Sequence, residues 1–263
     1  MEMKASKKEP VYVAFSTQKG GAGKTTLTAL VASYLHYERD YNVAVIDCDF
    51  PQLSIHNMRE RDLAMALEDE FYRGMAYEQF TRMENKKAYP VVRSNTNDAI
   101  IDAEKAVEES EKGFDIIFFD LPGTMNNRGL IHTLAHMDYI IAPIAASRVV
   151  MESTLDYMIS VRDNIVSTGK TNIKAMYLLW NLVDGREKSE LYEVYEAVIK
   201  ELDFPLLRTF LPNAVRFRRE QNIEHKPLFL STLFPPDKSL LKGSNVDTLT
   251  DELLEVFNLT GHE

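Results

Sequence analysis

Short apolar segments alternate with longer stretches of helical periodicity along most of the chain. An apolar run bounded by turn residues predicts a buried strand, whereas apolar residues three and four positions apart predict a helix. Regular alternation of the two is typical of a parallel sheet that helices cover on both faces. We therefore expect an α/β fold with a mostly parallel, twisted sheet. The expected strands are 11–16, 43–47, 115–120, 139–142, 173–180 and 206–210, and the expected helices are 24–37, 98–112, 151–167, 187–201, 214–222 and 246–257.

One folding unit accounts for this whole pattern. The chain has 263 residues, of which 45% are hydrophobic and 27% charged, and it is long enough to bury the core of one large domain. Neither an internal repeat nor a low-complexity linker divides it. We expect residues 1–10 to form a flexible N-terminal segment and residues 11–263 to form a single domain, in which the charged stretch 57–87 is helical.

Composition also bears on the compartment and on the partners. The N-terminal residues carry lysines but no apolar signal region, and the apolar stretch 139–146 is far too short to span a bilayer. Cys48 is the only cysteine, so an intrachain disulfide is impossible, and we expect a cytoplasmic protein without membrane attachment. The net charge of −10 argues against a surface that coats nucleic acid throughout, but not against a local basic patch.

Residues 18–26, with the sequence QKGGAGKTT, form the most informative segment of the chain. They lie between an apolar, strand-like run and an amphipathic stretch, which is the context of a phosphate-binding loop. The glycines let successive N–H groups turn toward a phosphate, and the helix N-terminus adds partial positive charge. Lys24 can reach the β- and γ-phosphates, and the Thr25 hydroxyl can ligate Mg²⁺. The candidate phosphate-binding residues are Gly20, Gly21, Ala22, Gly23, Lys24, Thr25 and Thr26.

Three aspartates follow apolar runs and could complete such a site. Asp47 and Asp49 are two residues apart at the end of an expected strand, so both can project toward the carboxyl end of the sheet. Asp120 ends the run FDIIFF, a Walker B pattern, and can hold Mg²⁺ through a water molecule. Gly123 offers a backbone N–H that could contact a γ-phosphate. An ordinary solvated turn with a helix cap is the competing interpretation of Asp47 and Asp49.

The glycine loop departs from the standard phosphate-loop pattern in a specific way. Gln18 stands where that pattern has glycine, and a second lysine, Lys19, lies inside the loop. The resulting K-G-G-x-G-K-T-T resembles the deviant Walker A motif of the family that includes ParA partition ATPases, MinD, the nitrogenase iron protein and ArsA. The resemblance implies a P-loop ATPase with ATP and Mg²⁺ as cofactors. It implies that Lys19, Lys24 and Asp49 are catalytic and that Thr25, Asp47 and Asp120 hold the metal.

The same resemblance suggests a role for each of these groups. Lys19 would cross to the ATP of a second subunit, and Asp49 would position or activate the attacking water. Asp47 would orient water around Mg²⁺. The sequence DCDFPQ is similar to the family's D-x-D-P-Q segment, with Phe50 inserted before the proline.

Two later segments are similar to the base-binding half of the family. LLWN ends in Asn181, which would read adenine, and LPNAVR contains Pro212, which would pack on the base. The second segment departs from the family's I-P-R-N-V-R pattern at Asn213 and Ala214. A turn residue at the end of a strand is the alternative interpretation of Asn181.

Within the family, the sequence is most similar to a short ParA-type partition ATPase. One cysteine cannot bind the nitrogenase cluster, the acidic C-terminal stretch is unlike the basic membrane helix of MinD, and ArsA has two loops in tandem. Details around Phe50 and Gly123 resemble variants carried by conjugative elements. The resemblance implies an ATP-dependent homodimer that binds DNA without sequence preference, and a stimulating ParB-like partner. A scaffold for a protein cargo and a small-molecule ATP-dependent enzyme remain alternatives.

The candidate DNA contacts are Arg216, Arg218 and Arg219, which form the densest basic cluster outside the N-terminus. On the expected helix 214–222, positions 216 and 219 share a face, and Arg216 matches the family's position for DNA contact. Two such patches, one from each subunit, would contact several phosphates. The alternative is a solvated helix face whose arginines pair with Glu220 and Glu224.

Overall fold

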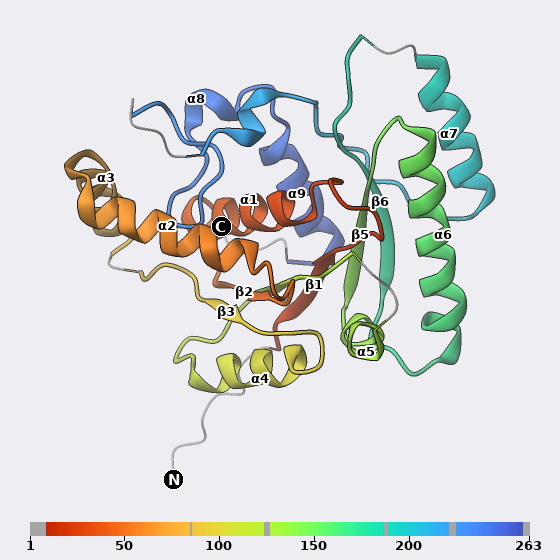
Figure 1. Cartoon of the computed structure of the whole chain (residues 1–263), viewed down its shortest axis with the longest axis horizontal. Coiled ribbons are helices and arrows are strands. Elements are labelled where there is room, and N and C mark those ends of the chain that lie inside the picture. The colour runs from red at the N-terminus through yellow and green to blue at the C-terminus, as the bar shows by residue number, and fades with distance from the viewer. Residues whose placement is uncertain (1–8, 85, 124–126, 187–188, 221–224, 260–263) are drawn as a thin grey trace.

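The computed structural model describes residues 9–84, 86–123, 127–186, 189–220 and 225–259, and these contain a six-stranded sheet (Figure 1). All paired strands run parallel, and their order across the sheet is β3-β2-β4-β1-β5-β6. The α/β fold with a parallel sheet is therefore confirmed. The strands are β1 Val11–Phe15, β2 Val43–Asp47, β3 Val91–Arg93, β4 Ile116–Asp120, β5 Tyr139–Ile144 and β6 Ala175–Trp180.

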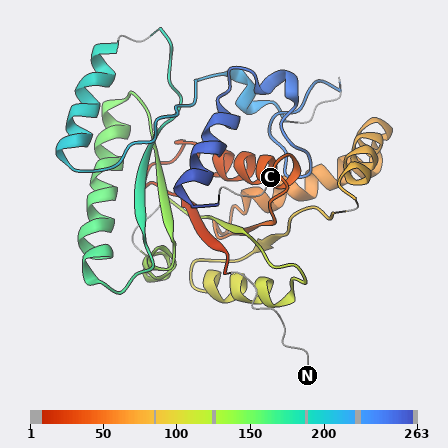
Figure 2. The same cartoon turned by 180° about the vertical axis from the view of Figure 1, so that it is seen from behind.

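Helices cover both faces of this sheet (Figures 1 and 2). Because successive strand residues point to opposite faces, Val13 and Phe15 belong to one apolar core and Ala14 to the other. The first core packs against α1 and α9, and the second packs against α4, α5, α6 and α7. The helices are α1 Lys24–Tyr37, α2 Ser54–Glu68, α3 Glu70–Arg82, α4 Ala99–Glu109, α5 Arg128–Ala135, α6 Arg148–Asn164, α7 Ser189–Glu201, α8 Lys238–Leu241 and α9 Val246–Val256, with short 3₁₀ turns at Val166–Thr168 and Val215–Arg218.

The expected strand 206–210 is wrong. Leu206 makes one isolated parallel bridge to Leu178, and Pro212 makes another to Val183, so the segment follows the edge of β6 without a continuous ladder. Pro205 and Pro212 flank the segment, and a proline has no N–H to donate to a ladder.

The expected helix 214–222 is also wrong. Its described part is the short 3₁₀ turn Val215–Arg218, and residues 221–222 lie outside the described residues. Ala214 and Phe217 pack on the same core whereas Val215 is 77% exposed, and a single 3₁₀ turn satisfies this spacing of three residues without a longer helix. The sequence analysis also missed β3, α5 and α8, which are too short to show a clear period.

None of the described helices combines the length and apolarity needed to cross a bilayer. Residues 1–8 lie outside the described residues, so the expected division at residue 10 stays a prediction.

Candidate nucleotide site

A cavity of about 660 Å³ lies where β1, β2 and β4 end side by side. Helix α1 begins directly at this cavity, and its N-cap residue Gly23 has a left-handed backbone with φ of 91° and no side-chain cap. The first N–H groups of an uncapped helix are well placed to bind an anion. The residues that line the cavity are Gln18, Gly20, Gly21, Gly23, Lys24, Thr25, Thr26, Asp49, Phe50, Pro51, Gln52, Pro122 and Gly123.

Thr25 and Asp120 meet at the base of the glycine loop. The Thr25 hydroxyl donates to both carboxylate oxygens of Asp120, at 2.9 and 3.1 Å. Asp120 is fully buried, and burial together with the charge of Asp47 raises the pKa of its carboxyl to about 7. A bound cation would remove this penalty because it favours the ionised carboxylate.

Lys24 lies in the same cavity. Its Nζ donates to the carbonyl of Lys19 at 3.3 Å, and burial lowers its pKa, although Asp120 and Asp49 oppose that shift. The loop of Gly123 closes over this amine, since a Cβ at Gly123 would lie 3.0 Å from the Gln18 carbonyl and 3.3 Å from Lys24 Nζ. A side chain at position 123 would therefore press on the phosphate loop.

A magnesium site fits these residues only if other ligands complete it. In the described part of the chain, no three His, Cys, Asp or Glu side chains cluster closely enough to hold a metal by themselves. Mg²⁺ usually takes one or two protein oxygens and fills its other positions with phosphate oxygens and water. The Thr25 hydroxyl and the Asp120 carboxylate suit this pattern.

The two other aspartates differ in what they face. Asp49 lines the cavity and is half-buried; burial raises the pKa of its carboxyl, and Lys24 lowers it. Asp47 is fully buried, and its carboxylate accepts hydrogen bonds from the backbone N–H groups of His56 at 2.9 Å and Asp49 at 3.4 Å. Asp47 thus caps the start of α2, as in the competing interpretation of this residue, but it does so in the interior and not in a solvated turn. Its role at the metal stays a prediction.

Lys19 has an exposed side chain at the mouth of the loop. This position leaves the amine accessible from outside the chain, and its action on a second subunit stays a prediction. Phe50, the inserted residue, is 65% exposed and lines the cavity beside Asp49.

The two candidate base-binding segments lie side by side at the end of β6. Leu211 donates its backbone N–H to the carbonyl of Trp180 at 2.8 Å, and Val183 donates to Leu211 at 3.0 Å. Asn181 is 6% exposed, and its Nδ2 donates to the carbonyl of Ala22 in the phosphate loop at 2.9 Å. The structure therefore brings Asn181 to the loop, whereas Pro212 pairs with Val183, two residues further along the chain. The contact of either residue with a base stays a prediction.

The three candidate DNA-binding arginines do not form one helical face. Arg216 donates from one guanidinium nitrogen to the carbonyls of Leu240 at 2.7 Å and Lys242 at 2.6 Å, so it holds the end of α8. Arg219 is exposed, and the side chain of Arg218 lies outside the described part. Glu220 pairs with Arg61 of α2.

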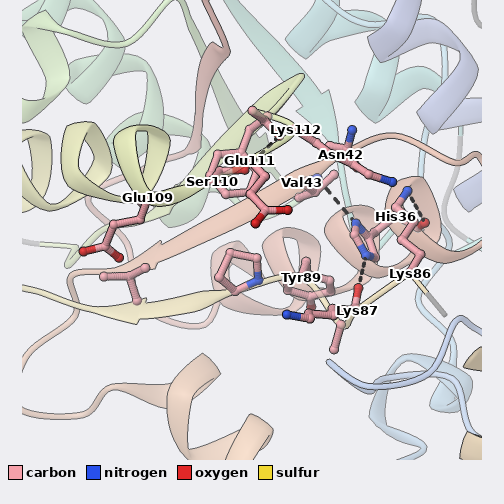
Figure 3. A pocket seen from close by; sticks show the side chains of 16 residues that line it. His36, Asn42, Val43, Lys86, Lys87, Tyr89, Glu109, Ser110, Glu111 and Lys112 are labelled. Atoms are coloured by element: carbon pink, nitrogen blue, oxygen red, sulfur yellow. Dashed lines mark hydrogen bonds between the residues drawn. The ribbon is translucent and has the colours of Figure 1, made fainter. Parts of the chain in front are cut away.

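A second cavity, of about 560 Å³, lies at the opposite end of α1 (Figure 3). His36 contacts the Lys87 carbonyl through Nε2 at 2.9 Å and accepts from the N–H of Val43 through Nδ1 at 3.4 Å. Burial lowers the pKa of His36 to about 4, so the ring is neutral near pH 7 and holds the wall together. Lysines and glutamates both line this cavity, so its charge favours neither an anion nor a cation.

Comparison with known proteins supplies a family match. A model described as the CobQ/CobB/MinD/ParA nucleotide binding domain matches residues 13–228. The uncharacterized protein BBD21 of Borreliella burgdorferi is 32% identical over 123 residues, which cover 41% of this chain and 49% of that protein. The match thus spans about half the length of this relative.

Solved structures share the fold at low sequence identity. BB_S35 of Borrelia burgdorferi, a candidate plasmid partition protein bound to AMPPNP, has a TM-score of 0.58 at 16% identity, covering 94% of this chain and 99% of that one. Cobyrinic acid a,c-diamide synthase of Mycobacterium smegmatis, with ADP and magnesium, has a TM-score of 0.55 at 16% identity, covering 78% of this chain and 88% of that one. At these identities the likeness is one of fold.

Proposed function

The chain belongs to the CobQ/CobB/MinD/ParA nucleotide-binding domain family, and we propose that it is an ATP-binding and ATP-hydrolysing switch of the ParA type. The observation that carries this proposal is the contact between Thr25 and Asp120 beneath the glycine loop. It joins the two groups expected to hold Mg²⁺ at the point where Lys24 faces the cavity.

The proposal assigns a role to each residue of the site. Lys24 and the N–H groups of residues 20–26 would bind the phosphates, and Thr25 and Asp120 would hold Mg²⁺, which neutralises charge on the phosphate oxygens. Asp49, half-buried at the cavity wall, would orient the attacking water. Asn181 and Pro212 would contact the base, and Gly123 would contact the terminal phosphate.

Switching would depend on a second copy of the chain. The exposed Lys19 would reach the ATP of that copy and stabilise phosphate charge there, so ATP would join two subunits. The proposed dimer would bind DNA without sequence preference and release it after hydrolysis stimulated by a ParB-like partner. We propose that the protein partitions DNA in the cytoplasm. Residues 11–263 would act as one domain.

Two alternatives keep the same site but change its use. A scaffold that positions a protein cargo would need the nucleotide and the dimer without DNA. A small-molecule enzyme would couple ATP hydrolysis to a reaction of its substrate. The fold shared with cobyrinic acid a,c-diamide synthase supports this alternative.

Three measurements on the wild-type protein and the Lys24→Ala and Lys19→Ala variants test the proposal. Lys24→Ala should abolish ATP binding, whereas Lys19→Ala should bind ATP as a monomer and fail to dimerise in light scattering. Lys200→Ala, which changes an exposed lysine on α7, should behave as wild type. ATP binding unaffected by Lys24→Ala would refute the nucleotide site. Wild-type dimers without affinity for long duplex DNA at low salt would favour the scaffold.

A further inference from the structure

Helix α2 begins immediately after the segment that carries Asp49 and Phe50, and it lacks a conventional N-cap. Leu53 occupies that position with φ of 45° and contributes no side-chain hydrogen bond. The carboxylate of Asp47 takes the cap's place by accepting from His56 N–H at 2.9 Å. A negative charge at a helix N-terminus stabilises the helix and is held by it in return. The orientation of Asp47 therefore depends on where α2 lies.

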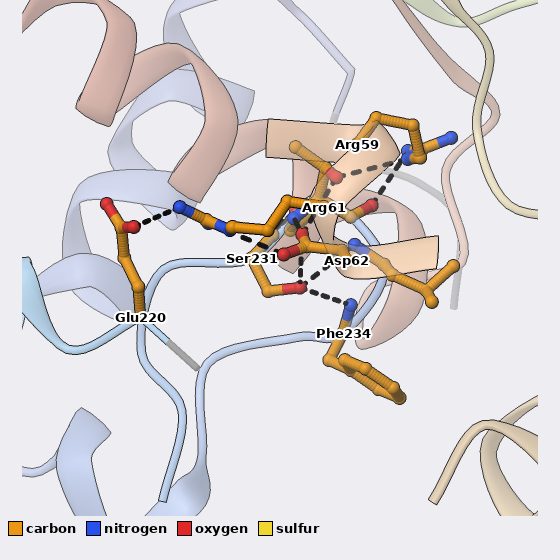
Figure 4. A network of polar contacts seen from close by, with 9 residues as sticks. Arg59, Arg61, Asp62, Glu220, Ser231 and Phe234 are labelled. Carbon is orange, nitrogen blue, oxygen red and sulfur yellow. Dashed lines mark hydrogen bonds and ion pairs between the residues drawn. The ribbon is translucent and has the colours of Figure 1, made fainter. Parts of the chain in front are cut away.

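Two turns further along, α2 is fastened by a buried carboxylate (Figure 4). Asp62 is 1% exposed, and one of its oxygens accepts from Ser231 Oγ at 2.8 Å, Thr232 N at 2.7 Å and Thr232 Oγ1 at 3.0 Å. Three hydrogen bonds to one charged oxygen compensate for the loss of water around it. This contact fixes α2 both along its axis and about it.

Arg59 fastens the same helix from a neighbouring position. Its guanidinium donates to the Tyr89 carbonyl at 2.7 Å and to the Thr232 carbonyl at 2.7 Å, and it lies 4.6 Å from the centre of the Tyr89 ring. Tyr89 in turn shares a hydrogen bond with Ser33 of α1 at 3.0 Å. Since α1 starts at the phosphate loop, Arg59 ties α2 to the element that carries Lys24.

We propose that Asp62 and Arg59 are positioning residues that hold α2 where the N–H of His56 meets Asp47. Asp62 lies six residues beyond His56, about 9 Å along a stiff helix, so a shift at one end moves the other. The part of this inference that concerns hydrolysis rests on the proposed function, because α2 orients the carboxylate of Asp47 and that carboxylate is expected at the metal. The positioning itself does not depend on hydrolysis.

A neighbouring ion pair provides the matched control. Arg61 pairs with Glu220, and the two side chains are 35% and 39% exposed. The other terminal nitrogen of Arg61 lies 3.4 Å from Asp62 Oδ1, a contact that Glu220→Gln does not alter. In the described chain, Arg61 Nε is a buried polar atom without a hydrogen-bond partner, so this pair is the less complete attachment of α2. Surface pairs of this kind contribute little to stability. Glu220→Gln should therefore leave Asp47 in place.

The test compares Asp62→Asn, the loop-side double variant Ser231→Ala/Thr232→Val, and Glu220→Gln in the full chain. Peptide-level hydrogen exchange without nucleotide should speed up roughly tenfold at 54–58 in the first two proteins and remain unchanged in the third. The Mg²⁺ concentration for half-maximal ATP hydrolysis should rise about tenfold in the same two, as for other residues that orient metal-associated carboxylates.

Several outcomes would overturn the inference. Unchanged exchange at 54–58 in the folded Asp62→Asn and double variants would refute it, as would an equal increase throughout the chain, which signals general destabilisation. The double variant alters no α2 residue, so it decides the question even if Asp62→Asn does not fold. A wild-type protein that does not hydrolyse ATP would refute the proposed function, whereas the exchange measurement would still decide the positioning role.

Discussion

The phosphate end of the cavity and the arginine-bearing segment 213–220 are both rich in charged side chains. They differ in whether those side chains already have partners of opposite charge or hydrogen-bond partners within the protein. Asp120 is fully buried beside Asp47, and the resulting rise of its pKa to about 7 reports charges without enough compensation. Arg216, in contrast, already binds two carbonyls, and Glu220 already pairs with Arg61. Buried charge awaiting a partner marks a ligand site better than a cluster of basic residues does.

The largest expected effect concerns Asp49, the carboxylate that lines the cavity. If it orients the attacking water, Asp49→Asn should lower the ATP hydrolysis rate roughly 10²- to 10⁴-fold while ATP binding persists. Single-turnover hydrolysis and equilibrium binding measure the two quantities separately. Asp184→Asn, which changes an acid paired with Arg186 outside the cavity, is the control. Equal losses in both variants would remove Asp49 from the proposed chemistry.

A second change tests the contact between the two halves of the site. A Cβ at Gly23 would lie 2.7 Å from Asn181 Nδ2, and φ of 91° is strained for any residue with a side chain. Gly23→Ala should therefore destabilise the fold by about 2 kcal/mol and weaken nucleotide binding. Thermal unfolding and nucleotide titration measure both effects.

Gly74 provides the matched control for this glycine. It lies within α3, where an added Cβ meets nothing within 4 Å, so Gly74→Ala should stabilise the protein by about 0.5–1 kcal/mol. If Gly23→Ala were as stable as wild type and bound nucleotide normally, the loop would not require a glycine at position 23.

The elements that flank the phosphate loop could be predicted from the sequence because their geometry is local. The helix 24–37 and the strand 43–47 are correct to the residue, since a glycine loop between a strand and a helix needs only neighbouring residues. A helix cap was the competing interpretation of Asp47, but its partner, the N–H of His56, could not be predicted because that requires knowing where α2 folds back. The error at 214–222 has the same origin, since Arg216 binds carbonyls 24 and 26 residues away.

His36 tests how a buried group behaves when its hydrogen bonds are complete. Its folded pKa of about 4 lies below the ordinary histidine value of 6.5, so the unfolded chain binds more protons between these values. Stability from neutral His36 is therefore full above pH 6.5 and is lost as the pH falls toward 4, by about 2 kcal/mol at pH 5. Nearby Lys86 and Arg59 strengthen this shift.

Denaturant unfolding of wild type and His36→Gln at pH 5 and 7.5 measures this contribution. The difference between the two proteins should shrink at pH 5, because only wild type loses stability through this ring. The comparison is needed because the raised pKa of Asp120 acts with the opposite sign in an overlapping range. A constant difference would mean that His36 titrates alike in the folded and unfolded chains.

The smallest effect separates the two arginines at positions 216 and 219. Arg216→Ala removes two hydrogen bonds that hold the end of α8 and should cost about 1–2 kcal/mol of unfolding free energy. Arg219→Ala changes an exposed side chain and should alter the free energy of unfolding by less than about 0.5 kcal/mol.

If the proposed dimer binds DNA through this segment, Arg219 has the more exposed side chain to contact a phosphate. Losing one such contact should lower the slope of log K against log salt by about 0.9. Duplex binding by Arg219→Ala with an unchanged salt slope would mean that DNA contacts the protein elsewhere, and that this segment serves the fold alone.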